Sequence, residues 1–176
     1  MRVDRSSTVV VGVDGSRASL AALTAALTDA AQGHRDVEVV TVWAAPAPVA
    51  ARDGGLFLSR AARRRALRLQ TMATALASRR AGVRVPVTGV LLDGDPAAIL
   101  VQASAGASEL VVGAPRSGTR DTGPTASVTR RCLAEALCPV RVVPTRVLSG
   151  SAGAAAAAVA GTTEPVQEGG LSHVGS

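Results

Sequence analysis

The sequence predicts an α/β fold, a five-stranded parallel sheet with helices on both faces, Rossmann-like and in a single domain. Short runs such as Val9-Val10-Val11 and Leu110-Val111-Val112 are apolar throughout, as strands buried on both faces of a parallel sheet are. Strand-like runs alternate five times with segments that carry apolar residues at helical spacing. In such sheets, ligands bind at the carboxyl ends of the strands where strand order reverses.

The first half of the chain contains two of the predicted strand–helix pairs. Residues 8–14 form the first strand, and Ser16 caps a helix that Gly33 ends. Residues 37–43 form the second strand, and a helix over residues 58–80 follows a segment rich in Pro and Ala. The buried stripe of that second helix is predicted to be Leu58, Ala62, Ala66, Leu69, Met72 and Leu76.

The second half begins with a glycine stop at Gly82 and a strand over residues 83–92. Asp95 and Pro96 supply a cap and a first-turn proline for the next helix. The remaining elements are predicted at 97–105 (helix), 110–112 (strand), 127 onward (helix) and 140–143 (strand, at a sheet edge because prolines flank it).

The loop from Gly113 to Ser127 is longer than an ordinary strand-to-helix turn of about 2 to 6 residues, which suggests a function. Ser127 is predicted to cap the following helix. The free backbone N–H groups at the start of that helix would then be available to bind an anion.

Composition excludes several kinds of chemistry. The net charge of +6 comes wholly from arginine, so no lysine is present for a Schiff base or a phosphate-binding loop. His34 and His173 are not placed to act as bases, and Cys132 and Cys138 are too few for a metal site or a disulfide framework. We therefore expect neither an enzyme nor a metal centre.

Arginines cluster at Arg60, Arg63, Arg64, Arg65 and Arg68 without interleaved aromatic residues. The expected explanation is a solvated helix face, with a polyanion-binding patch as the alternative, and no nucleic-acid partner is predicted. No signal peptide or membrane span is recognisable, which predicts a soluble, reduced, cytoplasmic protein. Residues 1–146 are expected to form the domain and residues 147–176 a disordered, low-complexity tail.

Three stretches together resemble the universal stress protein family over about residues 6 to 145. They are Val10-Val11-Gly12-Val13-Asp14-Gly15-Ser16, Leu92-Asp93-Gly94-Asp95-Pro96-Ala97, and Leu110-Val111-Val112-Gly113 with Cys138-Pro139-Val140-Arg141-Val142-Val143. The resemblance implies a small stress-response regulator, and in ATP-binding members it implies a loop of the form Gly, two residues, Gly, nine residues, Gly, then Ser or Thr.

This chain keeps the length of that loop but not all its glycines. Gly113 and Ser127 match, whereas Arg116 and Ala126 stand at glycine positions. By the resemblance, Val13, Asp14 and Val42 border adenine and ribose, while Ser127 and Val128 offer N–H groups to phosphates.

Two functions stay open. One is a nucleotide-responsive stress protein that binds ATP weakly, with Mg²⁺ if at all, through a degenerate loop. Slow ATP hydrolysis, seen in some relatives, stays open for this protein if ATP binds. The other is a dimeric interaction module of the same fold that binds no nucleotide and docks a protein partner still to be identified. Either is expected to be a homodimer through the last strand, as relatives are. Asp14 can also simply make a turn, and Gly113 can simply relieve crowding.

Overall fold

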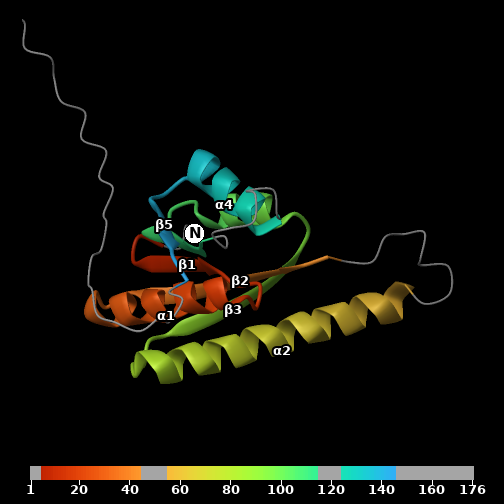
Figure 1. The fold of residues 1–176 in the computed structure, drawn as a ribbon, viewed down its shortest axis with the longest axis horizontal. Helices are drawn as coiled ribbons and strands as arrows, with labels where there is room; N and C mark the ends of the chain where they lie inside the picture. The colour runs from red at the N-terminus through yellow and green to blue at the C-terminus, as the bar shows by residue number, and fades with distance from the viewer. Residues whose placement is uncertain (1–4, 45–54, 115–123, 146–176) are drawn as a thin grey trace, which may run out of the picture. The chain divides into compact units, whose positions relative to one another are not determined.

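The computed structural model describes residues 5–44, 55–114 and 124–145. Within them, five parallel strands form one sheet in the order β3-β2-β1-β4-β5, and four helices connect the strands (Figure 1). The elements are β1 (Thr8–Gly12), α1 (Arg17–Gln32), β2 (Asp36–Trp43), α2 (Gly55–Ala81), β3 (Val87–Asp93), α3 (Pro96–Ala103), β4 (Glu109–Gly113), α4 (Pro124–Glu135) and β5 (Val140–Val143). The predicted fold class is confirmed, and β5 lies at a sheet edge as expected.

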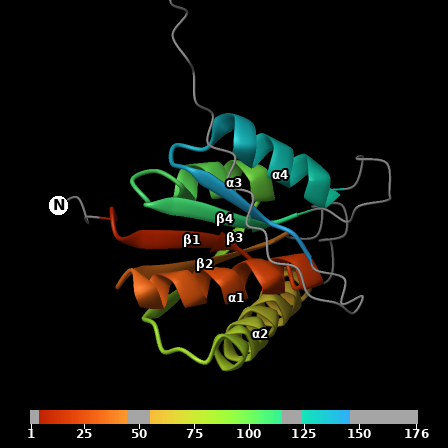
Figure 2. The same ribbon diagram turned by 60° about the vertical axis from the view of Figure 1, so that its left-hand side comes forward.

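The sheet separates two aliphatic cores, because successive side chains of a strand point to opposite faces. Val9 and Val11 of β1 pack with α1 and α2 on one face. Val10 of the same strand packs on the other face, where α3 and α4 lie (Figure 2). The strand order reverses between β1 and β4, so the carboxyl ends of these two strands define the switch point.

The helix ends follow the signals in the sequence. The Ser16 side chain accepts a hydrogen bond from the Ser19 amide and caps α1, and Asp95 caps α3 in the same way through Ala98. Gly82 follows α2 with a φ of 67°, a left-handed conformation that suits glycine. Gly33 is the C-cap of α1, as predicted, and the residue in the left-handed conformation there is His34, with a φ of 49°.

Two predicted strand bounds were wrong. β1 ends at Gly12 because Asp14 enters a turn, in which its carboxylate accepts a hydrogen bond from the Ser16 amide at 2.9 Å. β3 starts at Val87, directly after Pro86, because proline has no N–H to donate to a strand ladder.

The buried stripe of α2 was also predicted incorrectly at Met72, which is 72% exposed. Among the α2 residues whose side chains are described, those fully buried are Ala66, Gln70 and Ala77. Gln70 donates from Nε2 to the carbonyl oxygens of Val39 and Val90 at 2.9 and 3.0 Å, which ties α2 to β2 and β3. Of the predicted stripe, Ala66 is buried and Leu69 packs against the core, whereas the side chain of Leu58 lies outside the described residues. The apolar pattern was therefore wrong at Met72, and it gave no sign that the polar Gln70 is buried.

Among the described residues, no helix is long and apolar enough to cross a membrane. The predicted tail, residues 147–176, lies outside the described residues, so its disorder stays a prediction.

Candidate functional site

A cleft of about 250 Å³ opens at the switch point, where the carboxyl ends of β1 and β4 diverge. We call it the switch-point cleft. Its described lining comes from three strands and three helices: Gly12, Val13, Asp14, Ser16, Ala18, Ser19, Val40, Val42, Pro96, Leu100, Val112, Gly113, Val128 and Thr129.

The walls of the cleft are small and aliphatic. Val40, Leu100 and Val112 are also members of the core under α3 and α4, so the floor of the cleft is continuous with the hydrophobic core. The volume lies just below the range of about 300 to 1,000 Å³ that is usual for small-molecule pockets. An apolar slot of this size suits a flat ring system with few polar groups.

Asp14 is the only charged side chain among the described residues that line the cleft. Burial alone would raise the pKa of its carboxyl group, but hydrogen bonds from Ser16 and Ser19 outweigh that effect and hold the pKa below its ordinary value of 3.8. The carboxylate is therefore ionised at neutral pH, fixed at the end of β1, and able to accept hydrogen bonds from hydroxyl or amino groups. The same charge repels phosphate.

Gly113 ends β4 directly against the first turn of α1. A Cβ atom at Gly113 would lie 2.4 Å from the carbonyl carbon of Ala18 and 2.7 Å from its oxygen. These contacts are with backbone, which cannot rotate away. Close packing of α1 on β4 therefore requires glycine here, which supports the crowding interpretation without excluding a role in the cleft.

Helix α4 begins at Pro124, three residues earlier than the sequence predicts. Ser127 is thus not the N-cap but the fourth helical residue, and it is exposed. The first-turn N–H groups of a helix have no acceptor within the helix, and proline has no N–H group at all. The free N–H groups of this turn therefore belong to Thr125 and Ala126. Val128 lines the cleft, and Thr129 donates from its hydroxyl to the Gly113 carbonyl at 3.3 Å.

One ion pair crosses from α4 to the start of α3. Arg131 lies 2.6 Å from the Asp95 carboxylate that caps α3, and it also pairs with Glu135 one turn away. Both helices supply cleft residues, Pro96 and Leu100 from α3 and Val128 from α4. The pair therefore holds together the two helices on one side of the cleft.

The structure brings together five of the predicted site residues: Val13, Asp14, Val42, Gly113 and Val128 all line the cleft. Arg116 lies outside the described residues, as does the loop over 115–123, and the side chain of Ala126 is not described. Ser127 is not among the lining residues. The residues that sequence reasoning missed come mainly from helix first turns, such as Ala18 and Pro96, and from the strand floor, such as Val40.

Other predicted features have ordinary structural roles. Cys132 is fully buried, and burial raises the pKa of its thiol to about 11, so the thiol stays protonated and packs as a small apolar group. Trp43 is half-buried at the end of β2 and is not among the residues that line the cleft. Among the described residues, no group of three His, Cys, Asp or Glu side chains is arranged to hold a metal ion.

The fold and the cleft define a class: small doubly wound α/β proteins with a binding site at the switch point. Residues 6–144 match the model of the universal stress protein family, and the chain belongs to that family. No curated protein sequence matches the chain.

Solved structures agree with this assignment. A universal stress protein family member from Burkholderia pseudomallei is 30% identical, with a TM-score of 0.59 over 81% of this chain and 99% of that one. A universal stress protein solved in complex with cAMP is 25% identical, with a TM-score of 0.57 over 79% and 97% of the two chains. UspA from Lactobacillus plantarum is 19% identical and shows the same fold, with a TM-score of 0.63 over 79% and 98%.

Proposed function

We propose that this universal stress protein binds an adenine nucleotide in the switch-point cleft and acts as a small, cytoplasmic stress-response regulator through binding and not through catalysis. The observation that carries the proposal is the position of Asp14. It is the only charge in the described lining, which is mostly apolar apart from hydroxyl residues, and its carboxylate accepts a hydrogen bond from the Ser16 amide at 2.9 Å. The relative solved with cAMP, at 25% identity, supports a nucleotide as the ligand.

Different parts of the cleft suit different parts of an adenine nucleotide. The aliphatic walls of Val13, Val42 and Leu100 suit the adenine ring, and the Asp14 carboxylate suits ribose hydroxyl groups. Since that carboxylate repels phosphate, the phosphates extend toward the first turn of α4, where the helix dipole and the free amides favour negative charge.

ATP is the nucleotide we expect to bind weakly, with Mg²⁺ carried on its phosphates. Arg116 and Ala126 stand where ATP-binding relatives have glycine, and side chains there prevent the closest approach of backbone to phosphate. Arg116 also brings a charge that can pair with phosphate oxygen atoms. A good charge-assisted hydrogen bond contributes about 1.5 to 3 kcal/mol, and several backbone contacts together contribute more.

Mass spectrometry of the denatured, freshly purified protein tests whether a nucleotide is bound. Calorimetry then compares wild type with the double variant Arg116→Gly, Ala126→Gly, which we expect to bind ATP more tightly. Weaker binding by the double variant would identify Arg116 as a phosphate ligand. If neither protein binds ATP, AMP or cAMP, the proposal fails.

The alternative function is a dimeric interaction module that binds no nucleotide. The β5 edge favours it, because β5 is the last strand of the sheet and its apolar residues Val140, Val142 and Val143 are only partly buried. An open edge with apolar side chains is a pairing surface, and we expect a homodimer in either case. Sedimentation velocity at tens of micromolar, a range typical of weak dimers, measures the oligomeric state. Finding only monomer would refute the expected homodimer.

A further inference from the structure

The outer surface of α2 carries an unusual concentration of positive charge. From residue 54 to residue 92 the chain has no acidic residue and eight arginines: Arg60, Arg63, Arg64, Arg65, Arg68, Arg79, Arg80 and Arg84. We call these the α2 arginine face. The rest of the chain holds 11 arginines and 13 acidic residues, a net charge of −2, so the net positive charge of the protein comes wholly from the arginines of residues 60–84.

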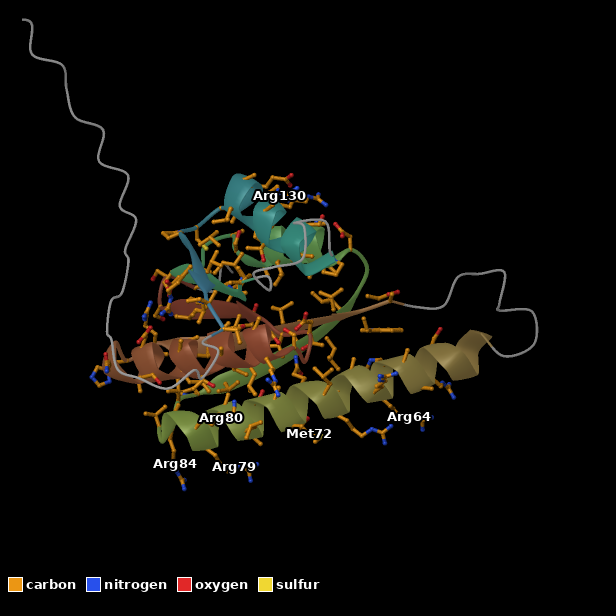
Figure 3. The ribbon with its side chains drawn as sticks, viewed as in Figure 1. Arg64, Met72, Arg79, Arg80, Arg84 and Arg130 are labelled. Atoms are coloured by element: carbon orange, nitrogen blue, oxygen red, sulfur yellow. The ribbon has the colours of Figure 1, made fainter. Side chains whose placement is uncertain are left out.

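All eight arginines are exposed. Within the described part of the chain, none of them forms an ion pair or a hydrogen bond, whereas Arg5, Arg131 and Arg141 elsewhere on the molecule all do. Figure 3 shows Arg64, Met72, Arg79 and Arg84 on the side of α2 that faces away from the sheet. Within the described residues these guanidinium groups are therefore uncompensated, and like charges this close repel each other.

We propose that the α2 arginine face binds the phosphate backbone of double-stranded nucleic acid without sequence preference. This proposal, which rests on the position of the exposed arginines, revises the expectation that the protein has no nucleic-acid partner. Guanidinium groups pair with phosphate oxygens through two parallel hydrogen bonds, which makes arginine the residue best suited to such a partner.

The dimensions of the helix match those of a duplex. Arg64 and Arg79 lie about 22 Å apart along the axis of α2, at 1.5 Å per residue. A duplex carries one phosphate charge per about 1.7 Å of its axis, so a duplex segment of this length carries about 13 phosphates on its two strands. The arginines form two groups, residues 60–68 on α2 and residues 79–84 at and just beyond its end, with no acidic residue between them. Two cationic groups spaced along one helix complement a rod of regularly spaced anions.

Two other partners fit the face less well. A membrane-surface helix needs a row of large apolar side chains toward the lipid, but α2 turns its apolar stripe to the sheet and exposes only Leu67 and Met72 among the large hydrophobic residues described. Single-stranded nucleic acid is usually held by aromatic stacking, and Trp43, on β2, is the only aromatic residue whose side chain the structure describes. Backbone contacts to a duplex require neither.

The α2 arginine face is separate from the proposed dimer edge. α2 packs against α1, β2 and β3, while β5 is at the other end of the sheet. It is also separate from the switch-point cleft, whose described lining includes no α2 residue. Loss of nucleotide binding in the cleft therefore leaves this inference intact, and the two can be tested independently.

Fluorescence anisotropy of the full chain with two labelled DNA duplexes of unrelated sequence tests the inference. From about 50 to 200 mM salt, log K should fall linearly with log salt, and both duplexes should bind alike. The variant Arg64→Gln, Arg79→Gln should lower the magnitude of the slope by about 1.8, because each lost phosphate contact removes about 0.9. The control Arg17→Gln, Arg130→Gln removes the same charge from α1 and α4 and should keep the wild-type slope.

Thermal unfolding of both variants, matched to wild type, shows that each is folded. Absence of duplex binding at about 50 mM salt would overturn the inference. So would an equal effect of the two variants, which would assign the binding to net charge alone. Preferential binding to phosphatidylserine vesicles, or displacement of the duplex by an equal charge concentration of polyglutamate, would instead assign the face to a membrane or to an acidic protein.

Discussion

Substitution of Gly113 by alanine should be among the most destabilising single-methyl changes in this protein. The new Cβ atom would lie 2.4 Å from the carbonyl carbon, 2.7 Å from the oxygen and 2.7 Å from the Cβ of Ala18, all within the first turn of α1. Ordinary van der Waals contact needs about 3.5 Å or more, so α1 and β4 must separate by about 1 Å. Both elements are fully packed in the core, where overpacking costs about 1 to 3 kcal/mol. We expect the upper end, about 3 kcal/mol.

The matched control is Gly12→Ala, at the end of the neighbouring strand. The three atoms nearest to its Cβ would all belong to the side chain of Leu100, at 2.9 Å and beyond, and that side chain can rotate. We expect a cost below about 1 kcal/mol, at the low end of overpacking effects. Chemical denaturation followed by circular dichroism, with the slope m fitted for each protein, measures both free energies of unfolding. Equal stability of the two variants would show that α1 is not seated on β4 as described.

Three further predictions follow from the fold and the site. The folded-state pKa of Asp14 is lowered, so the contribution of this carboxylate to stability is present above the ordinary pKa of 3.8 and is lost as pH falls through the lower folded-state pKa. Asp14→Asn should therefore flatten the acid limb of a curve of unfolding free energy against pH and leave the slope of the curve above about pH 5 unchanged. Arg141→Gln should lower the free energy of unfolding by about 1 kcal/mol in chemical denaturation, because Arg141 of β5 pairs with Asp29 of α1 and Glu109 of β4. The loss should be smaller at high salt, and a loss that salt does not change would contradict the ionic explanation. Removal of residues 147–176 should leave the melting temperature unchanged, and a fall of more than a few degrees, on the order of 1 kcal/mol, would show that the tail docks.

The sequence was sufficient for the fold because local and global signals agree in this chain. The helix caps and the helix stop lie where the sequence predicts them: Ser16 and Asp95 cap α1 and α3, and Gly82 follows the end of α2. The failures have physical causes. Gln70 is buried because its amide satisfies two strand carbonyls, and no periodicity rule anticipates a polar residue on a buried stripe.

The site was predictable in part. Asp14 follows the end of β1 and Gly113 ends the adjacent strand β4, so the parallel-sheet rule brings them together at the switch point. Ala18 and Thr129 could not be predicted, because their positions depend on how closely α1 and α4 pack against β4. The start of α4 was also missed, since a helix with proline in its first turn can begin before the hydroxyl residue that seemed to cap it.

Calorimetric titration of wild type, Asp14→Asn and Asp93→Asn with AMP, cAMP and ATP tests the central claim most directly. Asp93 is an exposed carboxylate at the end of β3, on the same edge of the sheet but not part of the cleft lining, and it is the charge-matched control. We predict that wild type and Asp93→Asn bind at least one of these nucleotides with equal affinity. Asp14→Asn should bind it at least tenfold more weakly, since a hydrogen bond to a charged group contributes about 1.5 to 3 kcal/mol. Absence of binding to wild type, or equal affinities of all three proteins, would contradict the assignment of the cleft as a nucleotide site.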